Sequence, residues 1–199
     1  ASRADISIPG VQEELVQALL DTGKPVVVVL MNGRPLTISK LTEQVPAIVE
    51  GWFLGTETGN AIADVLLGKY NPSGKLTMSF PRNVGQIPVF YNYRQSGRPG
   101  TDKLTKWTNR FIDSPVSPLY PFGYGLSYTT FSYSAPRVSQ KEFSTNEILK
   151  VSVDVTNTGQ YDGEETIQLY IRDVIASVTR PVKELKGFKK IFLRKGETR

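Results

Sequence analysis

The sequence predicts an α/β region followed by an all-β region, and three observations carry this prediction. Apolar residues first recur at helical spacing and then form a continuous β-branched run from Pro25 to Met31. A long stretch from Arg82 to Pro118 loses all periodicity and is rich in Pro, Gly, Asn and Ser. Beyond it, apolar and polar residues alternate one by one. We therefore expect helices beside a parallel sheet first and antiparallel strands second.

The first elements are a helix and two strands. Apolar residues between Val11 and Leu19 share one helix face, and Gly23 is placed to end that helix. The run from Pro25 to Met31 reads as a buried parallel strand, and residues 47–53 as a second strand. Trp52, at the end of that second strand, is expected to pack in the core rather than to stack on a sugar.

A second helix follows, with Thr56 placed to cap it and Gly68 to end it. Two helices and two strands make only part of a doubly wound sheet, because parallel strands are normally covered on both faces. We therefore expect the α/β region to be incomplete. An open sheet edge of this kind favours a homodimer.

The last third predicts a small β-sandwich. Residues 151–155 and 167–171 alternate as antiparallel strands with one wet face, and the segment between them carries Gly-containing turn signals. Residues 180–199 predict a further strand with a solvated Lys/Arg face. The turn at Lys195-Gly196-Glu197 is expected to have no strand after it, so both ends of the chain resemble cuts.

Composition narrows the function. The 199 residues are 39% hydrophobic and 22% charged, which is typical of a soluble globular protein, and no apolar run approaches the roughly 20 residues of a membrane helix. The absence of Cys and His excludes thiolate or imidazole metal sites and histidine triads, and we expect no metal and no cofactor. Residues 180–199 contain eight basic and two acidic residues, a net charge of +6, whereas the rest of the chain has a net charge of −1. The positive charge is therefore confined to one predicted strand and does not indicate nucleic-acid binding.

Three stretches resemble glycoside hydrolase family 3, and together they are specific: Gly55–Gly68, Asn71–Pro81 and Pro118–Tyr128. The similarity spans nearly the whole chain and is greatest to the bacterial periplasmic β-glucosidase subgroup. In that family a barrel domain precedes an α/β sandwich domain and a fibronectin type III-like β-sandwich. The resemblance implies the end of the α/β sandwich in residues 1–81, a linker and long loop in 82–125, and an incomplete fibronectin type III-like domain in 126–199.

The resemblance also implies a retaining mechanism that releases terminal non-reducing β-D-glucosyl residues. A barrel Asp is the nucleophile and a Glu of the α/β domain the acid/base, and both correspond to positions upstream of Ala1. We therefore expect no catalytic residue in this chain, no activity of the chain by itself, and the upstream barrel domain as its partner. The subgroup implies a periplasmic or secreted protein.

The long loop offers the candidate substrate-binding residues. Trp107 lies between Arg98, Lys106 and Arg110, and an exposed aromatic flanked by hydrogen-bonding cations suits a sugar face and its hydroxyls. We expect residues 92–113 to reach the mouth of the active site in the intact enzyme. The same residues could instead pack the loop onto a neighbouring domain.

Other polar residues have structural alternatives. Arg34 follows the carboxyl end of a strand, where α/β domains place ligands, and an ion pair suits it equally well. Glu57 is expected to be a charge at a helix N-terminus and Asp64 a hydrogen-bond acceptor, not a catalytic pair. For the chain as a whole, the alternatives to a hydrolase part are a carbohydrate-binding module and a structural interaction module.

Overall fold

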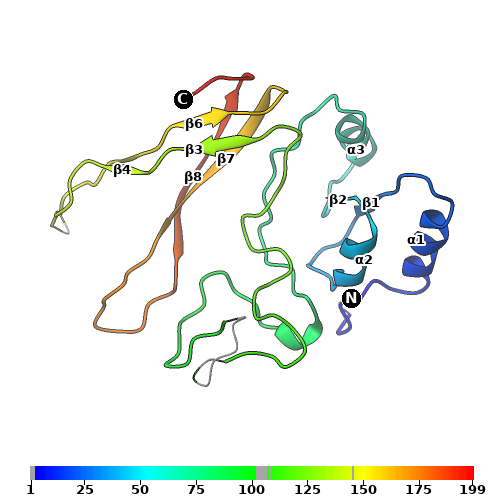
Figure 1. Ribbon diagram of the computed structural model, residues 1–199, viewed down its shortest axis with the longest axis horizontal. Helices are drawn as coiled ribbons and strands as arrows, with labels where there is room; N and C mark the ends of the chain where they lie inside the picture. The colour runs from blue at the N-terminus through cyan, green and yellow to red at the C-terminus, as the bar shows by residue number, and fades with distance from the viewer. Residues whose placement is uncertain (1–2, 102–106, 108, 145) are drawn as a thin grey trace. The chain divides into compact units, whose positions relative to one another are not determined.

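The computed structural model describes residues 3–101, 107, 109–144 and 146–199, and Figure 1 labels its elements. The chain forms two compact units. The first unit comprises Ala1–Ile62, Leu76–Tyr124 and Tyr170–Lys186, and the second comprises Ala63–Lys75, Gly125–Leu169 and Gly187–Arg199. The domain boundaries expected at residues 81 and 126 stay a prediction. In the part of the chain that the structure covers, every helix is too short or too polar to cross a bilayer.

The first unit is built around a parallel pair of strands. Val27 is opposite Ala47 and Leu30 is opposite Glu50, which confirms the predicted parallel arrangement. Its elements in chain order are α1 (Gln12–Leu20), β1 (Val27–Leu30), α2 (Ser39–Gln44), β2 (Ala47–Glu50), the start of α3 (Thr58–Leu66) and the 3₁₀ helix η1 (Val84–Gln86).

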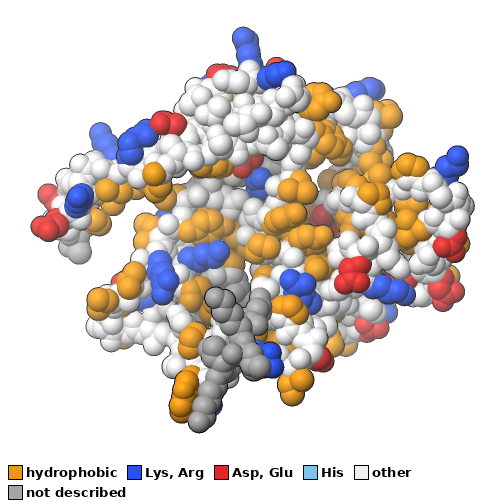
Figure 2. All heavy atoms as spheres, viewed as in Figure 1, with side chains coloured by type: hydrophobic (Ala, Val, Ile, Leu, Met, Phe, Trp, Pro, Cys, Tyr) orange, Lys and Arg blue, Asp and Glu red, His pale blue; other side chains and the backbone are white. Residues whose placement is uncertain are grey.

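Burial of β1 increases towards its carboxyl end. Leu30 is buried, whereas the side chain of Val27 is 46% exposed, so the expectation of a fully buried strand is wrong at its first residue. The reason is that β1 has one strand neighbour among the described residues, and α1 contributes no buried side chain. Figure 2 shows hydrophobic side chains exposed across the visible face, with Lys and Arg side chains scattered among them.

The core of the first unit lies beside α2, which the periodicity did not predict. Leu41 on α2 is 2% exposed and packs in one cluster with Leu30, Ile38, Val45 and Phe80. A helix of six residues with one buried side chain repeats its apolar position too few times to give a helical pattern. Tertiary packing, rather than sequence period, therefore forms α2.

The second unit confirms the expected antiparallel strands. β3 pairs with β6 and β4 pairs with β5, both antiparallel. The long strands β7 and β8 pair with each other, and the end of β7 and the start of β8 belong to the first unit. These strands are β3 (Phe131–Tyr133), β4 (Arg137–Val138), β5 (Val151–Ser152), β6 (Val155–Asn157), β7 (Gly163–Ile171) and β8 (Glu184–Leu193). In Figure 1 β7 and β8 are the long orange strands.

The turn after β8 leads into further pairing, which corrects one expectation. Gly196 has a φ of +77°, as a turn requires, but the residues after it run antiparallel to β6. The main chains of Val155 and Arg199 exchange hydrogen bonds of 2.7 and 2.9 Å, and Thr198 is opposite Thr156. The outward main-chain groups of β6 are satisfied in this way.

Candidate functional site

The candidate site loop, residues 92–113, contains one bridge between two of its described residues. Gly100 and Asn109 form a parallel bridge, with hydrogen bonds from Thr101 N to Asn109 O (3.2 Å) and from Asn109 N to Pro99 O (3.3 Å). A bridge of this kind lets one part of a loop support another without regular secondary structure.

The bridge lies close in sequence to three of the candidate residues. Arg98 comes two residues before Gly100, Trp107 comes two residues before Asn109, and Arg110 directly follows Asn109. Trp107 is 66% exposed, although it takes part in an interaction within the chain, and both arginines are exposed. Lys106 lies outside the described residues.

An aromatic stack anchors the start of the loop. The Tyr91 ring stacks on Phe122, with centroids 4.2 Å apart and planes at 16°, and meets Tyr170 edge-on at 6.0 Å. The Lys183 ammonium lies 5.1 Å from the Tyr170 ring, a cation–π contact. Val182 N donates to Tyr93 O at 2.9 Å, so main-chain pairing adds to the stack.

A buried glutamine anchors the end of the loop. Gln86 is 7% exposed and its amide nitrogen donates to Pro115 O (2.7 Å) and Ser117 O (3.2 Å). Its amide oxygen accepts from Arg82 N at 2.6 Å. The Gln86 side chain thus replaces main-chain partners for the segment just after the loop and for Arg82, a role that its polar character did not suggest in sequence.

A second group of polar residues lies at the carboxyl end of β1 and β2. Asn32 follows β1 and donates from its amide to Arg34 O at 2.7 Å, while Glu50 ends β2 and accepts from Trp52 N at 2.9 Å. Burial raises the pKa of Glu50, and the bonds from Trp52 N–H and Asn32 oppose that rise.

Two predictions about this edge are decided. Trp52 packs 5.9 Å from the Phe80 ring and joins the core cluster, which confirms core packing over sugar stacking. Its φ is +48°, a left-handed backbone that is uncommon outside glycine. Arg34 is half-buried and forms no ion pair with any residue that the structure describes, so the ion-pair alternative is not found there.

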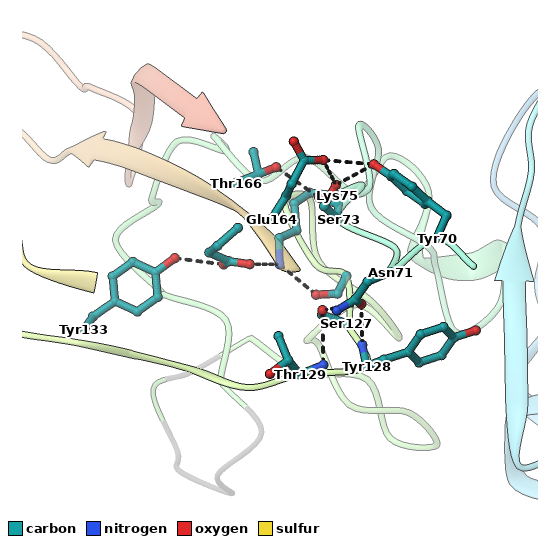
Figure 3. Close-up of polar contacts among 12 residues, drawn as sticks. Tyr70, Asn71, Ser73, Lys75, Ser127, Tyr128, Thr129, Tyr133, Glu164 and Thr166 are labelled. Carbon is teal, nitrogen blue, oxygen red and sulfur yellow. Dashed lines mark hydrogen bonds and ion pairs between the residues drawn. The ribbon is translucent and has the colours of Figure 1, made fainter. Parts of the chain in front are cut away.

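Carboxylates of the second unit are engaged in a polar cluster, which Figure 3 shows in close-up. Lys75 Nζ lies 3.2 Å from Glu165, both side chains being largely buried, and also donates to Gly125 O at 2.9 Å. Tyr133 donates its hydroxyl to Glu165 at 2.8 Å. Burial and this carboxylate raise the pKa of Tyr133. We call Lys75, Glu165 and Tyr133 the Lys75 cluster.

The neighbouring Glu164 points to a different set of partners. It accepts from the Tyr70 hydroxyl at 2.9 Å and from Ser73 at 3.3 Å, and it pairs with Lys190 at 3.6 Å. Consecutive residues of a strand face opposite sides, and each carboxylate is already bonded, so Glu164 and Glu165 do not form the facing pair that retaining hydrolysis requires.

The carboxylates near α3 are structural as well. Glu57 accepts from the Asn60 amide at 2.6 Å, and Asp64 lies 3.8 Å from Lys69 at the surface. Across the described ranges, no group of three or more acidic side chains is arranged to hold a metal ion.

Comparisons with known proteins identify both parts of the chain. The family model "Glycosyl hydrolase family 3 C-terminal domain" matches residues 1–128, and the "Fibronectin type III-like domain" model matches residues 165–199.

Similar proteins cover the whole chain. A periplasmic β-glucosidase of Salmonella typhimurium is 56% identical over 99% of this chain and 26% of that protein. A β-xylosidase of Formosa agariphila is 52% identical over 99% of this chain and 26% of that protein. The crystal structure of a β-glucosidase from Listeria innocua in complex with gluconolactone superposes with a TM-score of 0.94 at 46% identity, covering 100% of this chain and 28% of that one. The chain thus spans about a quarter of the length of its curated relatives.

Proposed function

The chain belongs to glycoside hydrolase family 3, and from this premise we propose that it is the C-terminal part of a retaining β-glycosidase that hydrolyses terminal non-reducing β-D-glucosyl residues. The observation that carries the proposal is the 56% identity to a periplasmic β-glucosidase over 99% of the chain, with only 26% of that protein spanned. The barrel nucleophile and the acid/base then belong to the upstream part, whose barrel domain is the partner of this chain.

The test compares the chain with the complete protein on aryl β-glucoside and aryl β-xyloside. We expect turnover of the glucoside by the complete protein and none by residues 1–199, because the chain supplies neither catalytic carboxylate. Turnover by residues 1–199 that survives repurification would show that they carry a catalytic pair of their own. Preference of the complete protein for the xyloside would reassign the sugar and leave the reaction class intact.

A titration with cello-oligosaccharides separates this function from the alternatives. Binding by residues 1–199 at millimolar concentration or better favours a carbohydrate-binding module, whereas no binding favours a part that works only with the barrel domain.

The resemblance to a periplasmic enzyme further supports a periplasmic or secreted location for the complete protein.

We assign the site loop, residues 92–113, to the mouth of the sugar-binding pocket. Trp107 would stack on the sugar, and Arg98, Lys106 and Arg110 would bond its hydroxyls. The supporting observation is that Trp107 is exposed and that Arg98 and Trp107 each lie two residues before one partner of the bridge between Gly100 and Asn109. In the complete enzyme, Trp107→Ala is expected to raise KM for cellobiose roughly tenfold, which corresponds to about 1.4 kcal/mol.

The conservative variant Trp107→Phe keeps an aromatic face and is expected to recover most of that affinity. An aryl glucoside, which has different leaving-group contacts, should be affected less by either change. Unchanged KM values with a lowered melting temperature would show that Trp107 only packs the loop.

A homodimer through the outer edge of the β1–β2 pair is a further proposal, supported by the half-exposed first residue of β1. Sedimentation of the complete protein tests this proposal. A monomer at micromolar concentration would contradict it and would mean that other parts of the same chain cover the edge.

A further inference from the structure

Large apolar side chains lie exposed at the carboxyl end of the β1–β2 pair. Met31, the residue after β1, is 60% exposed, and Phe53, three residues after β2, is 84% exposed. Leu54 follows Phe53 and is exposed as well. The parallel register and the bond from Gly51 N to Leu30 O (2.8 Å) bring the two segments that carry these residues to one end of the pair. We call Met31, Phe53 and Leu54 the edge patch.

The exposed Phe53 ring lies against the backbone of Gly33. Two of its ring carbons are 2.5 and 2.6 Å from the place that a Cβ on Gly33 would take, so a side chain at position 33 would push the ring away. The preceding residue, Trp52, has a φ of +48°, donates its N–H to Glu50 at 2.9 Å and packs in the core cluster. Such backbone conformations persist only where their surroundings determine them. Here the outcome is that Trp52 is turned into the core and Phe53 remains outside.

The residue types at this end of the pair suit a protein interface. Aromatic residues, Met and Arg are enriched at the centre of interfaces. Arg34 directly follows Gly33, is half-buried and forms no ion pair with any described residue. The side chains of the edge patch offer no strong donor or acceptor to sugar hydroxyls. A protein surface therefore suits the patch better than a sugar does.

The upstream part of the same protein is the partner that fits. This chain matches only 26% of the length of the Salmonella typhimurium β-glucosidase. A domain joined through the chain is present at an effective concentration on the order of millimolar, far above that of a second copy in dilute solution. Exposed apolar patches mark such contacts. We propose that the edge patch docks on the upstream barrel domain, with Phe53 as the anchor and Arg34 available to a carboxylate of that domain.

The docking rests on the proposed function, because that function supplies the barrel domain as the partner. It uses other residues than the proposed homodimer. Val27, on which the homodimer proposal rests, begins β1, whereas the edge patch lies beyond the opposite ends of β1 and β2.

The first measurement is hydroxyl-radical oxidation of the complete wild-type protein, followed for each residue by mass spectrometry. We expect Met31 and Phe53 to be protected, relative to the denatured protein, as strongly as Phe80, which is buried in the first core. Protection as weak as that of the exposed Phe188 on β8 would overturn the proposal. Sedimentation of the same sample is the control, because protection that appears only in a dimer would give the patch to a second copy and overturn the proposal too.

The second measurement uses a thiol at position 31 to follow how often the contact opens. Residues 1–199 contain no Cys, so Met31→Cys in the complete protein places one thiol in this part, and mass spectrometry follows its alkylation. Loss of an aromatic anchor typically changes an association constant by roughly 30-fold or more, so adding Phe53→Ala should accelerate alkylation by about that factor. Phe188→Ala, the same truncation at another exposed ring, should leave the rate unchanged.

Equal alkylation rates with Phe53→Ala and Phe188→Ala would refute the anchoring role of Phe53. If the Phe53→Ala protein fails to fold, the oxidation of the wild type decides the proposal. Turnover of an aryl β-glucoside by the same samples separates the two proposals. Turnover with an exposed edge patch would overturn the docking alone, whereas a protected patch without turnover would support the docking and contradict the proposed activity.

Discussion

Removal of the Lys75 ammonium is expected to leave Glu165 as a buried charge with no cation. At the observed separation of 3.2 Å, the attraction between the two charges is roughly 5 kcal/mol at an effective dielectric constant of about 20. Only part of this is net stabilisation, because both ions lost hydration on folding. Breaking one partner of such a pair typically costs about 3–5 kcal/mol, and Lys75→Met should cost this much.

Lys75→Met is best compared with Lys190→Met by thermal unfolding. For a chain of this size the expected loss corresponds to roughly 6 to 20 °C in melting temperature. Lys190 pairs with Glu164 at 3.6 Å, but its side chain is 46% exposed, so its loss should cost about 0–1 kcal/mol.

The double variant Lys75→Met/Glu165→Gln tests the cause of the loss. It removes the unpaired charge yet keeps an acceptor for Tyr133, and should recover much of the stability. Equal losses for Lys75→Met and Lys190→Met, or no recovery in the double variant, would refute the argument from burial.

Three further predictions concern the core, a turn and a surface ion pair. Phe80→Ala should cost about 3–5 kcal/mol in urea unfolding, because Phe80 is 2% exposed at the centre of the first core. Gly159→Ala should destabilise by about 1–3 kcal/mol, since its new Cβ would lie 2.6 Å from a backbone nitrogen, whereas Gly187→Ala, with nothing within 4 Å, tests whether any added methyl has that effect. Arg137 lowers the pKa of Asp154 through two bonds of 2.7 Å, so Asp154→Asn should lose stability near pH 7 and match the wild type once pH falls below the folded-state pKa.

Local sequence signals predicted the elements that depend on backbone chemistry. The β-branched run produced a parallel strand, and Gly23 and Gly68 end helices with φ of +72° each. Both features follow from residues next to each other in the chain. They are independent of the distant parts of the fold.

Features that depend on distant residues were not predictable in the same way. Alternation from Val151 to Val155 suggested one strand, but β5 ends at Ser152 and β6 starts at Val155. There the Ser134 hydroxyl accepts from Asp154 N at 3.0 Å, so a side chain from the residue after β3 takes the place of a main-chain partner. The pattern of apolar and polar residues cannot predict that a side chain will replace a main-chain partner.

In the candidate site too, local features could be predicted from the sequence and long-range contacts could not. The exposure of Trp107 agrees with its place in an irregular, polar stretch, whereas the supports of its loop come from far along the chain. Gln86 reaches Pro115 across 29 positions, and Tyr91 meets Tyr170. Glu50 looks in sequence like a solvated strand end, yet it is half-buried and its carboxylate accepts from Trp52 N.

The interleaved path of the chain limits how this protein can be cut and recombined. The chain passes between the compact units after residues 62, 75, 124, 169 and 186. A graft that takes the sandwich from residue 126 onward would leave Lys75 behind and carry Glu165 away without its cation. Chimeras that exchange this module between enzymes should therefore transplant residues 63–75 together with residues 125–169 and 187–199, because three pieces of sequence form this one folded unit.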